Sequence, residues 1–322
     1  MSIPIYILKR IIHTIPILVF VSIIGFVVMK TSPIDPLTQL KLTPGVSENT
    51  IKKEEERLGI NKPLYIQYFS WVANFLQGNM GVSLTNQSVN SRIVERVPNT
   101  ILLISISIFV SWMIGIPLGV FAALNWRTSM DRILTILASI GMAVPSFFFA
   151  LLMLIFAVQT GLLPVGGLTS VGFEEMTLFE KMKDLAYHLI APVTVIGTIS
   201  VAGIQRQMRA NLLDVLEADY VKFARAKGLS EFIVIVKHAI RNAVNPLVTL
   251  LGFEFASLLS GAALVEMVLN YPGLGSLILN AVREGDTNLV MASLMIGAIM
   301  LIVGNLLADI ALKFVDPRIT LE

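Results

Sequence analysis

Long apolar runs separated by polar stretches dominate the pattern along this chain. Six runs approach or exceed the roughly 20 apolar residues that a helix needs to cross a bilayer. They are Ile11–Met29, Ile101–Leu124, Thr135–Val158, Leu189–Ile204, Val244–Leu269 and Val290–Leu312. The fourth run is shorter and contains Pro192, and the fifth contains Glu254 and Glu266. The pattern predicts an all-α, polytopic membrane protein with six transmembrane helices.

The long polar segment after the first run has a helical pattern of its own. A charged helix is predicted over Thr50–Leu58, and Gly59 is expected to end it. Apolar residues then recur at helical spacing, at Leu64, Tyr68, Trp71, Val72, Phe75 and Leu76. This second pattern predicts an amphipathic helix that lies at the outer membrane face, packs as a lid on the other helices, or does both.

These patterns divide the chain into three parts. Residues 1–30 hold an N-terminal tail and the first transmembrane helix, and residues 31–99 form an extracytoplasmic loop with amphipathic helices. Residues 100–322 form a core with five transmembrane helices and a cytoplasmic loop at about 205–243.

Basic residues indicate which side each polar segment faces, because Lys and Arg concentrate in cytoplasmic loops. Lys9 and Arg10 precede the first run, which is too long for a signal peptide, so we expect a retained helix after a cytoplasmic tail. The loop at about 205–243 carries Arg206, Arg209, Lys222, Arg225, Lys227, Lys237 and Arg241. An even number of spans then places both termini in the cytoplasm.

The composition is typical of a membrane protein and excludes several classes of function. The chain is 55% hydrophobic and 14% charged, with a mean hydropathy of +0.78, whereas soluble domains carry about 25% charged residues. The net charge of +2 gives no indication of nucleic-acid binding. No cysteine is present, which excludes disulfides, iron–sulfur clusters and thiol nucleophiles.

Motifs for catalysis are missing as well. The sequence holds no phosphate-binding loop of the Gly-x-x-x-x-Gly-Lys-Ser/Thr type, no His-Glu-x-x-His and no Gly-x-Ser-x-Gly. We therefore predict no enzyme and no cofactor or metal site in this chain. Few ionisable residues lie in the apolar runs, which favours an external source of energy. Glu254 and Glu266 are the candidates for the translocation pathway, and a structural hydrogen bond is the alternative for Glu254.

The segment from Asp214 to Pro246 carries the strongest functional signal. Its first half predicts a short charged helix on the cytoplasmic side, with Ala224 and Ala226 permitting close approach. Gly228 is expected to end this helix and Ser230 to cap the next. Taken alone, the pattern fits a helix that grips an acidic groove of a partner, or one that lies on anionic lipid.

The same segment carries a resemblance to a known family. Asp219-Tyr220-Val221, Ala224-Arg225-Ala226-Lys227-Gly228-Leu229 and Lys237-His238-Ala239-Ile240-Arg241-Asn242-Ala243 resemble the cytoplasmic loop of the oligopeptide/dipeptide/nickel permeases of ATP-binding-cassette (ABC) importers. Further matches are Gly59–Leu64, Gln67-Tyr68, Gly78–Ser83, Arg96–Thr100, Gly115–Gly119, Gly261–Glu266, Tyr271–Gly275 and Val315–Arg318. The resemblance covers essentially the whole chain, and the long first outer loop resembles the B-type subunit.

The resemblance implies the transmembrane domain of a type I ABC importer in the cell membrane. A second, C-type permease, two ATPase subunits that bind ATP and Mg, and an extracytoplasmic substrate-binding protein would be its partners. A coupling helix would seat on an ATPase subunit through Tyr220, Lys222, Ala224, Arg225, Ala226, Lys227, Gly228 and Leu229. Peptides are the expected cargo, with nickel or a metallophore complex as the alternative. The rival hypothesis is an autonomous secondary transporter.

Three positions depart from the family pattern. Pro33-Ile34-Asp35-Pro36 stands where the family has Pro-Gly-Asp-Pro, and Asp286-Thr287-Asn288 lacks the usual proline. In the cytoplasmic loop, Lys222-Phe223-Ala224 and Arg241 replace the Glu-Ala-Ala start and the later proline of the general importer motif. The acidic residue that begins the general importer motif therefore has no counterpart in this chain.

Overall fold

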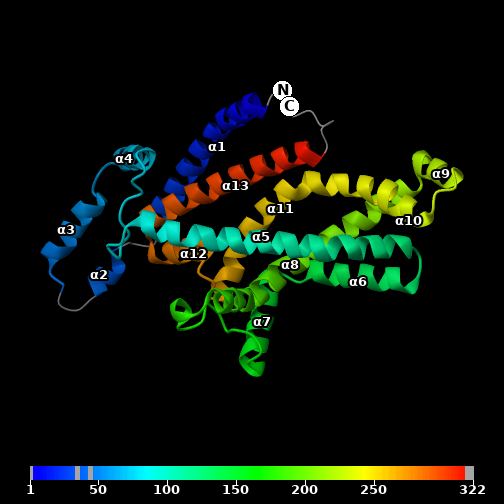
Figure 1. Cartoon of the computed structure of the whole chain (residues 1–322). Helices are drawn as coiled ribbons and strands as arrows, with labels where there is room; N and C mark the ends of the chain where they lie inside the picture. Colours follow the sequence, from blue (N-terminus) through cyan, green and yellow to red (C-terminus); the bar gives the residue numbers. More distant parts are fainter. Residues whose placement is uncertain (1–2, 33–36, 43–45, 316–322) are drawn as a thin grey trace.

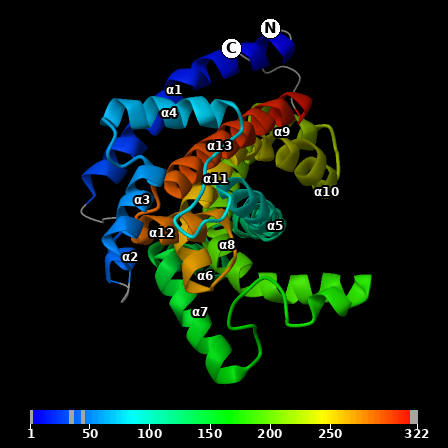
Figure 2. The same cartoon turned by 90° about the vertical axis from the view of Figure 1, so that its left-hand side faces the viewer.

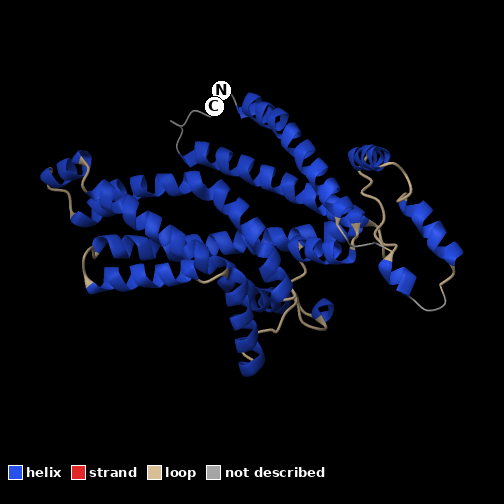
Figure 3. Ribbon diagram, turned by 180° about the vertical axis from the view of Figure 1, so that it is seen from behind, coloured by secondary structure: helices blue, strands red, loops and turns tan. Residues whose placement is uncertain are grey.

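The computed structural model describes residues 3–32, 37–42 and 46–315, and these residues are helical apart from turns, loops and one isolated β-bridge between Val82 and Ser88. Pro33–Pro36 and most of the closing Val315–Arg318 motif lie outside the described residues. Figures 1 and 3 show long helices side by side, with shorter helices at both ends of the bundle. In chain order the helices are α1 (Ile3–Thr31), α2 (Thr38–Leu42), α3 (Glu48–Leu58), α4 (Leu64–Leu76), α5 (Val89–Leu124), α6 (Ser129–Ala143), α7 (Ser146–Thr160), the 3₁₀ turn η1 (Phe173–Glu175), α8 (Leu178–Leu216), α9 (Asp219–Ala226), α10 (Glu231–Ile233), the π-helical stretch η2 (Val234–Ile240), α11 (Arg241–Val268), α12 (Leu274–Glu284) and α13 (Thr287–Val315).

Five helices among the described residues are long and apolar enough to cross a membrane, and the pair α6–α7 makes a sixth span if it is counted as one. The predicted third segment, Thr135–Val158, is therefore not one continuous helix, because α6 and α7 meet at an angle of 97°. The break follows from Pro145, which restricts the preceding residue to extended backbone. Val144 has φ −81° and ψ 119°, and α7 projects away from the bundle in Figure 1.

The fourth span is far longer than its apolar run. The sequence predicts Leu189–Ile204, whereas α8 continues for 39 residues. Polar residues extend it at both ends: Thr177 and Glu180 form a reciprocal capping box at its start, and Arg209 near its end pairs with Asp131 of α6 at 2.6 and 2.9 Å. Helical backbone thus continues into regions that hydropathy alone does not assign to a span.

Helices α5 and α8 make the most extensive helix–helix contact among the described residues. A Cβ atom on Gly119 would lie 2.6 Å from Met208 Cβ, and one on Gly115 would lie 2.9 Å from Ile204 Cβ. Such distances are sterically forbidden, so the two glycines are what allows the backbones to approach. The small-x-x-x-small spacing of Gly115 and Gly119 has its usual packing role in membrane helices.

We call the end of the bundle that carries α3 and α4 the outer end, and the end that carries α9 the inner end (Figure 1). The predicted α3 helix is confirmed, with Ser47 as its cap and Gly59 ending it at φ +64°. The predicted amphipathic helix is α4, which lies against α1, where Tyr68 hydrogen-bonds Ser22 at 2.8 Å (Figure 2).

Two contacts join distant segments for which the sequence predicts the same side of the membrane. On the inner side, Asp309 of α13 accepts hydrogen bonds from Tyr6 at 2.6 Å and Arg10 at 2.8 Å. On the outer side, Asp286 accepts a bond from the backbone N–H of Leu84 at 2.9 Å. Each contact joins two segments that the sequence places on one face of the membrane.

Candidate functional site

Helix α9 projects from the inner end of the bundle, between the end of α8 and the start of α10 (Figure 1). Its end is set by Gly228, which has φ +78° and whose N–H donates to the carbonyl of Arg225 at 2.9 Å. Ser230 occupies the capping position of α10, but its side chain makes no capping hydrogen bond. The sequence therefore correctly predicted that Gly228 ends α9 and that Ser230 occupies the N-cap position of α10.

One face of α9 packs on the bundle and the other is open. Val221 and Ala224 are buried against Val215 of α8 and Val234 of η2. On the open side Phe223 is 62% exposed and Tyr220 45% exposed. Phe232 of α10, at 73%, and Leu229 are exposed nearby in sequence. We call residues 217–233 the projecting loop.

An aqueous loop that exposes this much aromatic surface is suited to a protein partner. Tyr220 and Leu229 were among the predicted coupling residues. Phe223 and Phe232 were not, although their apolar character at solvent-facing positions of a charged helix is a visible signal.

The basic residues of the projecting loop divide into two kinds. Arg225 is held inside the loop, because its guanidinium donates to Glu231 through Nη2 at 2.7 Å and Nε at 3.1 Å. Lys222 and Lys227 face outward: Lys222 Nζ lies 3.7 Å from Asp219 Oδ1 and its side chain is 62% exposed, and the Lys227 ammonium lies 4.6 Å from the centroid of the Phe223 ring. Arg225 therefore braces α9 against α10, whereas Lys222 pairs only with an exposed carboxylate and Lys227 has no ion pair among the described residues.

The base of the projecting loop is rigid. Met208 and Leu212 of α8 are fully buried in a cluster with Ala239 and Ala243. Asn211 Nδ2 donates to the carbonyl of Ala243 at 2.9 Å, which ties α8 to the first turn of α11. Helix α9 therefore stands on a tightly packed base in which α8 and α11 are held together.

Glu254, a predicted pathway residue, lies within the bundle on α11. Its Oε2 accepts a hydrogen bond from the indole Nε1 of Trp112 on α5 at 2.7 Å. Its Oε1 is buried and has no hydrogen-bond partner among the described residues. A buried carboxylate oxygen without a partner is costly, which makes Glu254 the intramembrane acid with unused binding capacity.

Glu266, the other predicted pathway residue, has a different setting. It is fully buried, and its carboxylate accepts hydrogen bonds from Thr100 Oγ1 at 2.8 Å and from the N–H of Ser276 at 2.9 Å. Thr100 Oγ1 in turn accepts from the N–H of Leu274 at 2.7 Å. Glu266 and Thr100 thus satisfy the free N–H groups at the start of α12, which has no capping side chain of its own.

Further bonds complete this arrangement, which we call the outer clamp: Asn99, Thr100, Glu266, Tyr271, Leu274 and Ser276. The Tyr271 hydroxyl donates to the carbonyl of Asn99 at 2.8 Å, and Asn99 Nδ2 donates to the carbonyl of Pro272 at 2.8 Å. Burial raises the pKa of Tyr271, so its hydroxyl stays protonated as the donor. Gly273 is required here, since a Cβ would lie 2.2 Å from the Glu266 carboxyl group.

The outer clamp brings together three sequence motifs: Arg96–Thr100, Gly261–Glu266 and Tyr271–Gly275. In the sequence they served only as marks of the family resemblance, and Asn99 and Thr100 were not among the predicted functional residues. Their local pattern carries no sign that they meet, because the bonds join residues up to 174 positions apart.

Two family models match this chain. The model described as "Binding-protein-dependent transport system inner membrane component" matches residues 115–321, and the model of the N-terminal part of such membrane components matches residues 4–107. Among curated proteins, the oligopeptide transport system permease protein AppB of Bacillus subtilis is 39% identical over 98% of both chains. OppB of Haemophilus influenzae and the glutathione transport system permease protein GsiC of Escherichia coli K12 are each 33% identical over 98% of both chains.

A solved structure shares the fold. The inward-facing MetNI methionine ABC transporter matches with a TM-score of 0.56 and 18% identity, over 69% of this chain and 95% of that one. The matched motifs, the helical architecture and these relatives together establish the kind of protein. The chain belongs to the family of binding-protein-dependent inner-membrane transport components, as a B-type permease subunit of the oligopeptide/dipeptide/nickel branch of ABC importers.

Proposed function

We propose that this chain forms half of the translocation pathway of a peptide importer and couples that pathway to ATPase subunits through α9. The observation that carries the coupling role is the projecting loop, which exposes Phe223 and Phe232 to the aqueous phase on a rigid base. Support for peptide cargo comes from the relatives, whose names specify oligopeptides and the tripeptide glutathione. These names favour peptides over nickel.

The partners in this proposal are a second permease, two ATPase subunits that bind ATP and Mg, and an extracytoplasmic substrate-binding protein. The family description and the ABC transporter fold support such an assembly. Both termini lie in the cytoplasm, together with the projecting loop. The rest of the pathway comes from the second permease, and the lipid bilayer surrounds both.

Coupling works through α9 as a lever. ATP binding closes the two ATPase subunits, and α9 moves with the subunit on which it sits. The contacts of α9 with α8 and η2 pass this movement to the membrane helices, which switch the cavity between inward- and outward-facing states. The ATPase subunits can shift the equilibrium between the inward- and outward-facing states only as far as their contacts with α9 differ between the two states. Helix α9 must therefore bind tightly to its ATPase subunit.

Within the pathway, we assign to Glu254 the contact with cargo, since its Oε1 has no protein partner among the described residues. Replacing Glu254 by Gln then lowers uptake or changes substrate preference, which peptide-uptake assays with reconstituted importer measure. Unchanged uptake and preference would leave Glu254 with its structural bond to Trp112. The bonds of Glu266 within the outer clamp favour a structural role for it, and its place in the pathway stays a prediction.

The coupling role is tested by a charge swap across the Arg225–Glu231 pair. We expect Arg225→Glu to abolish ATP-driven uptake while insertion continues, because two carboxylates then repel each other between α9 and α10. The double variant Arg225→Glu/Glu231→Arg restores the brace and most of the uptake. Reconstituted complexes, assayed for peptide uptake and ATPase activity, give the answer. Undiminished coupling in Arg225→Glu, or a swap without rescue, contradicts this role of the pair.

A broader test addresses the rival, an autonomous transporter. The chain has no cysteine, so Lys227→Cys introduces a single thiol on the projecting loop. A membrane-impermeant thiol reagent labels this position only from the cytoplasmic side if the topology is correct. Labelling from outside, or peptide uptake by the purified chain alone on an ion gradient, overturns the proposed function.

A further inference from the structure

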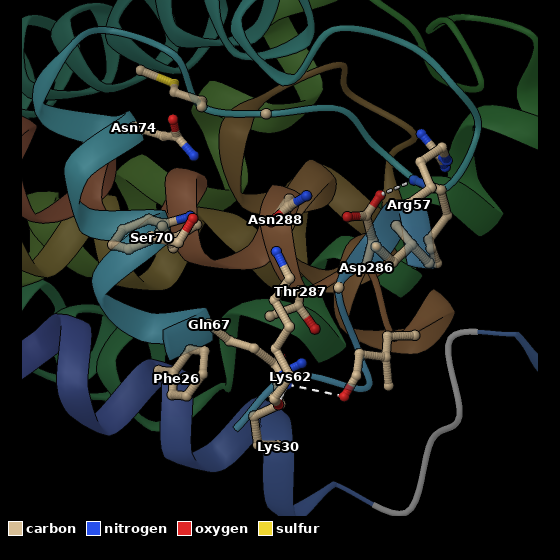
Figure 4. A pocket seen from close by; sticks show the side chains of 18 of the residues that line it. Phe26, Lys30, Arg57, Lys62, Gln67, Ser70, Asn74, Asp286, Thr287 and Asn288 are labelled. Atoms are coloured by element: carbon tan, nitrogen blue, oxygen red, sulfur yellow. Dashed lines mark hydrogen bonds between the residues drawn. The ribbon is translucent and has the colours of Figure 1, made fainter. Parts of the chain in front are cut away.

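A polar pocket of about 240 Å³ opens at the outer end of the bundle, and the transport mechanism described above does not use it (Figure 4). Five separate parts of the chain line it: the end of α1, the end of α3 with the α3–α4 connection, one face of α4, the segment after α4, and the turn between α12 and α13. Two motifs that carry the family resemblance, Gly59–Leu64 and Gly78–Ser83, supply residues to its wall. The fold therefore brings otherwise unexplained motifs together around one cavity.

The acceptor groups in the pocket wall are mostly occupied by the protein itself. Asp286 accepts from the N–H of Leu84 at 2.9 Å and from the N–H of Leu289 at 3.0 Å. Asn79 Oδ1 accepts from the N–H of Gly81 at 3.0 Å. The remaining acid in the wall, Glu56, belongs to the exposed surface of α3.

Some donor groups of the wall, such as Gln67 Nε2 and Asn288 Nδ2, are bonded to backbone carbonyls, but three others have no partner among the described residues. Lys30 is half-buried over the Phe26 ring, 5.7 Å from its centroid, and has no ion-pair partner among the described residues. Lys62 likewise has no ion pair in the described structure, whereas Arg57 is engaged by Glu54. The indole Nε1 of Trp71 is buried and has no hydrogen-bond acceptor within the described part of the chain. Figure 4 shows Lys30 and Lys62 at the same side of the pocket.

The buried indole N–H of Trp71 and the half-buried Lys30 have no acceptor among the described residues, and the exposed Lys62 adds a second positive charge. Together these groups favour an anion, because a buried donor without an acceptor is unfavourable. The volume suits a carboxylate side chain with a few waters, each of which takes about 30 Å³. The pocket thus has the chemistry and the size to receive an aspartate or glutamate side chain.

The orientation of α4 indicates from which side this anion comes. Gln67, Ser70, Trp71 and Asn74 line the pocket, and their spacing places them on one face of the helix. The exposed apolar residues Tyr65, Phe69 and Leu76 lie on the opposite face. Lipid suits the apolar face, so the pocket on the polar face is open to a partner from the aqueous phase.

We propose that this pocket receives an acidic side chain of the extracytoplasmic substrate-binding protein, with Lys30, Lys62 and the Trp71 indole as its ligands. This proposal rests on the proposed function, which supplies the binding protein on the outer side. It adds a charged anchor point in the B-type subunit that orients the binding protein over the pathway.

The probe is the substrate-binding protein that co-purifies with the tagged importer, identified by mass spectrometry and then expressed alone. Its affinity for the importer in nanodiscs is measured at low and high salt. Lys30→Gln/Lys62→Gln weakens binding by about tenfold at low salt and flattens the salt dependence. The matched control Lys52→Gln/Lys53→Gln removes two exposed lysines of α3 outside the pocket and changes binding less than twofold.

A second variant tests the indole without altering charge. Trp71→Phe keeps the aromatic stack with Phe75, whose ring centroid lies 5.2 Å away, and removes only the N–H donor. We expect a threefold to fivefold loss of affinity. Basal ATPase activity without the binding protein remains at the wild-type level in all variants, which shows that they fold and assemble.

The outcomes separate the two proposals. If the wild-type importer binds the protein and the pocket variants bind equally well, the pocket proposal is overturned and the proposed function stands. If the wild-type importer does not bind the substrate-binding protein at all, the pocket proposal and the proposed function are both wrong. If native mass spectrometry finds an anionic phospholipid that the double lysine variant loses, while affinity for the binding protein is unchanged, the occupant is lipid and the proposal is wrong.

Discussion

The outer clamp and the projecting loop use similar residue types for opposite purposes. Both contain a glutamate, an aromatic residue and a glycine within a turn between helices. In the clamp, Glu266 and Tyr271 are buried and fully bonded, and Gly273 has no room for a side chain. In the projecting loop, Glu231 and Phe223 are exposed, and a Cβ on Gly228 would meet no atom within 4 Å.

The difference shows which region holds the fold and which serves a partner. A change in the clamp disturbs buried polar groups and tight packing, so its effect appears as lost stability. A change in the projecting loop meets solvent, so its effect on the isolated subunit is small. Its effect on transport is large if an ATPase subunit seats there. The predictions below test this contrast in order of decreasing effect on stability.

The largest expected loss comes from Gly273→Ala in the clamp. The backbone at Gly273 has φ −103°, which alanine adopts freely, so the cost is purely steric: the new Cβ displaces the Glu266 carboxylate. We expect a loss of about 3 kcal/mol, seen as a lower unfolding midpoint of the detergent-solubilised complex. Gly261→Ala is the matched control, because a Cβ there has no neighbour within 4 Å. Equal midpoints for the two variants would contradict the tight packing of the clamp.

Thr100→Val removes one hydroxyl from the clamp with almost no change in shape. The variant leaves the N–H of Leu274 without its acceptor and Glu266 without one of its donors. We expect a loss of about 2 kcal/mol, measured by the same unfolding midpoint. Thr100→Ser retains the hydroxyl and serves as the control. A valine variant as stable as the wild type would show that water replaces the threonine in the clamp.

Gly228→Val in the projecting loop has a smaller expected cost. The new side chain meets open space, but a β-branched residue is disfavoured at φ +78°, by about 1 kcal/mol. Gly228→Asn is the control, because asparagine tolerates this left-handed conformation. We expect valine to reduce ATP-coupled uptake and asparagine to retain most of it. Equal uptake in the two variants would show that coupling does not depend on the left-handed conformation that ends α9.

Phe223→Ser is expected to change the stability of the subunit by less than about 0.5 kcal/mol. Its ring is mostly solvent-exposed, so burial of the ring occurs only when a partner covers it. The variant nevertheless loses ATP-coupled uptake and co-purifies with less ATPase subunit. Val171→Ser replaces a fully exposed apolar side chain in another loop and leaves both measurements unchanged. If Phe223→Ser destabilises the subunit and leaves assembly intact, the contrast between the two regions is wrong.

Much of this protein was predictable from local pattern. The apolar runs indicated the spanning segments, Gly59 marked the end of α3, and the charged stretch before Gly228 indicated α9. These features depend on residues within a few positions of each other, on helical periodicity and on turn chemistry. The 97° bend between α6 and α7 was not predicted, because the apolar run Thr135–Val158 indicates a single span.

What the sequence by itself determined, then, is the membrane class, the approximate positions of most membrane helices and, through motif resemblance, the family. Only the tertiary structure decided that Arg225 is paired with Glu231, that Glu266 caps α12 together with Thr100, and that Lys30 and Lys62 of the outer pocket have no ion-pair partner among the described residues. The physical reason is the distance along the sequence over which each kind of interaction acts. Helix formation and membrane insertion follow from neighbouring residues, whereas the pairing of a buried charge depends on which distant helix the fold brings beside it.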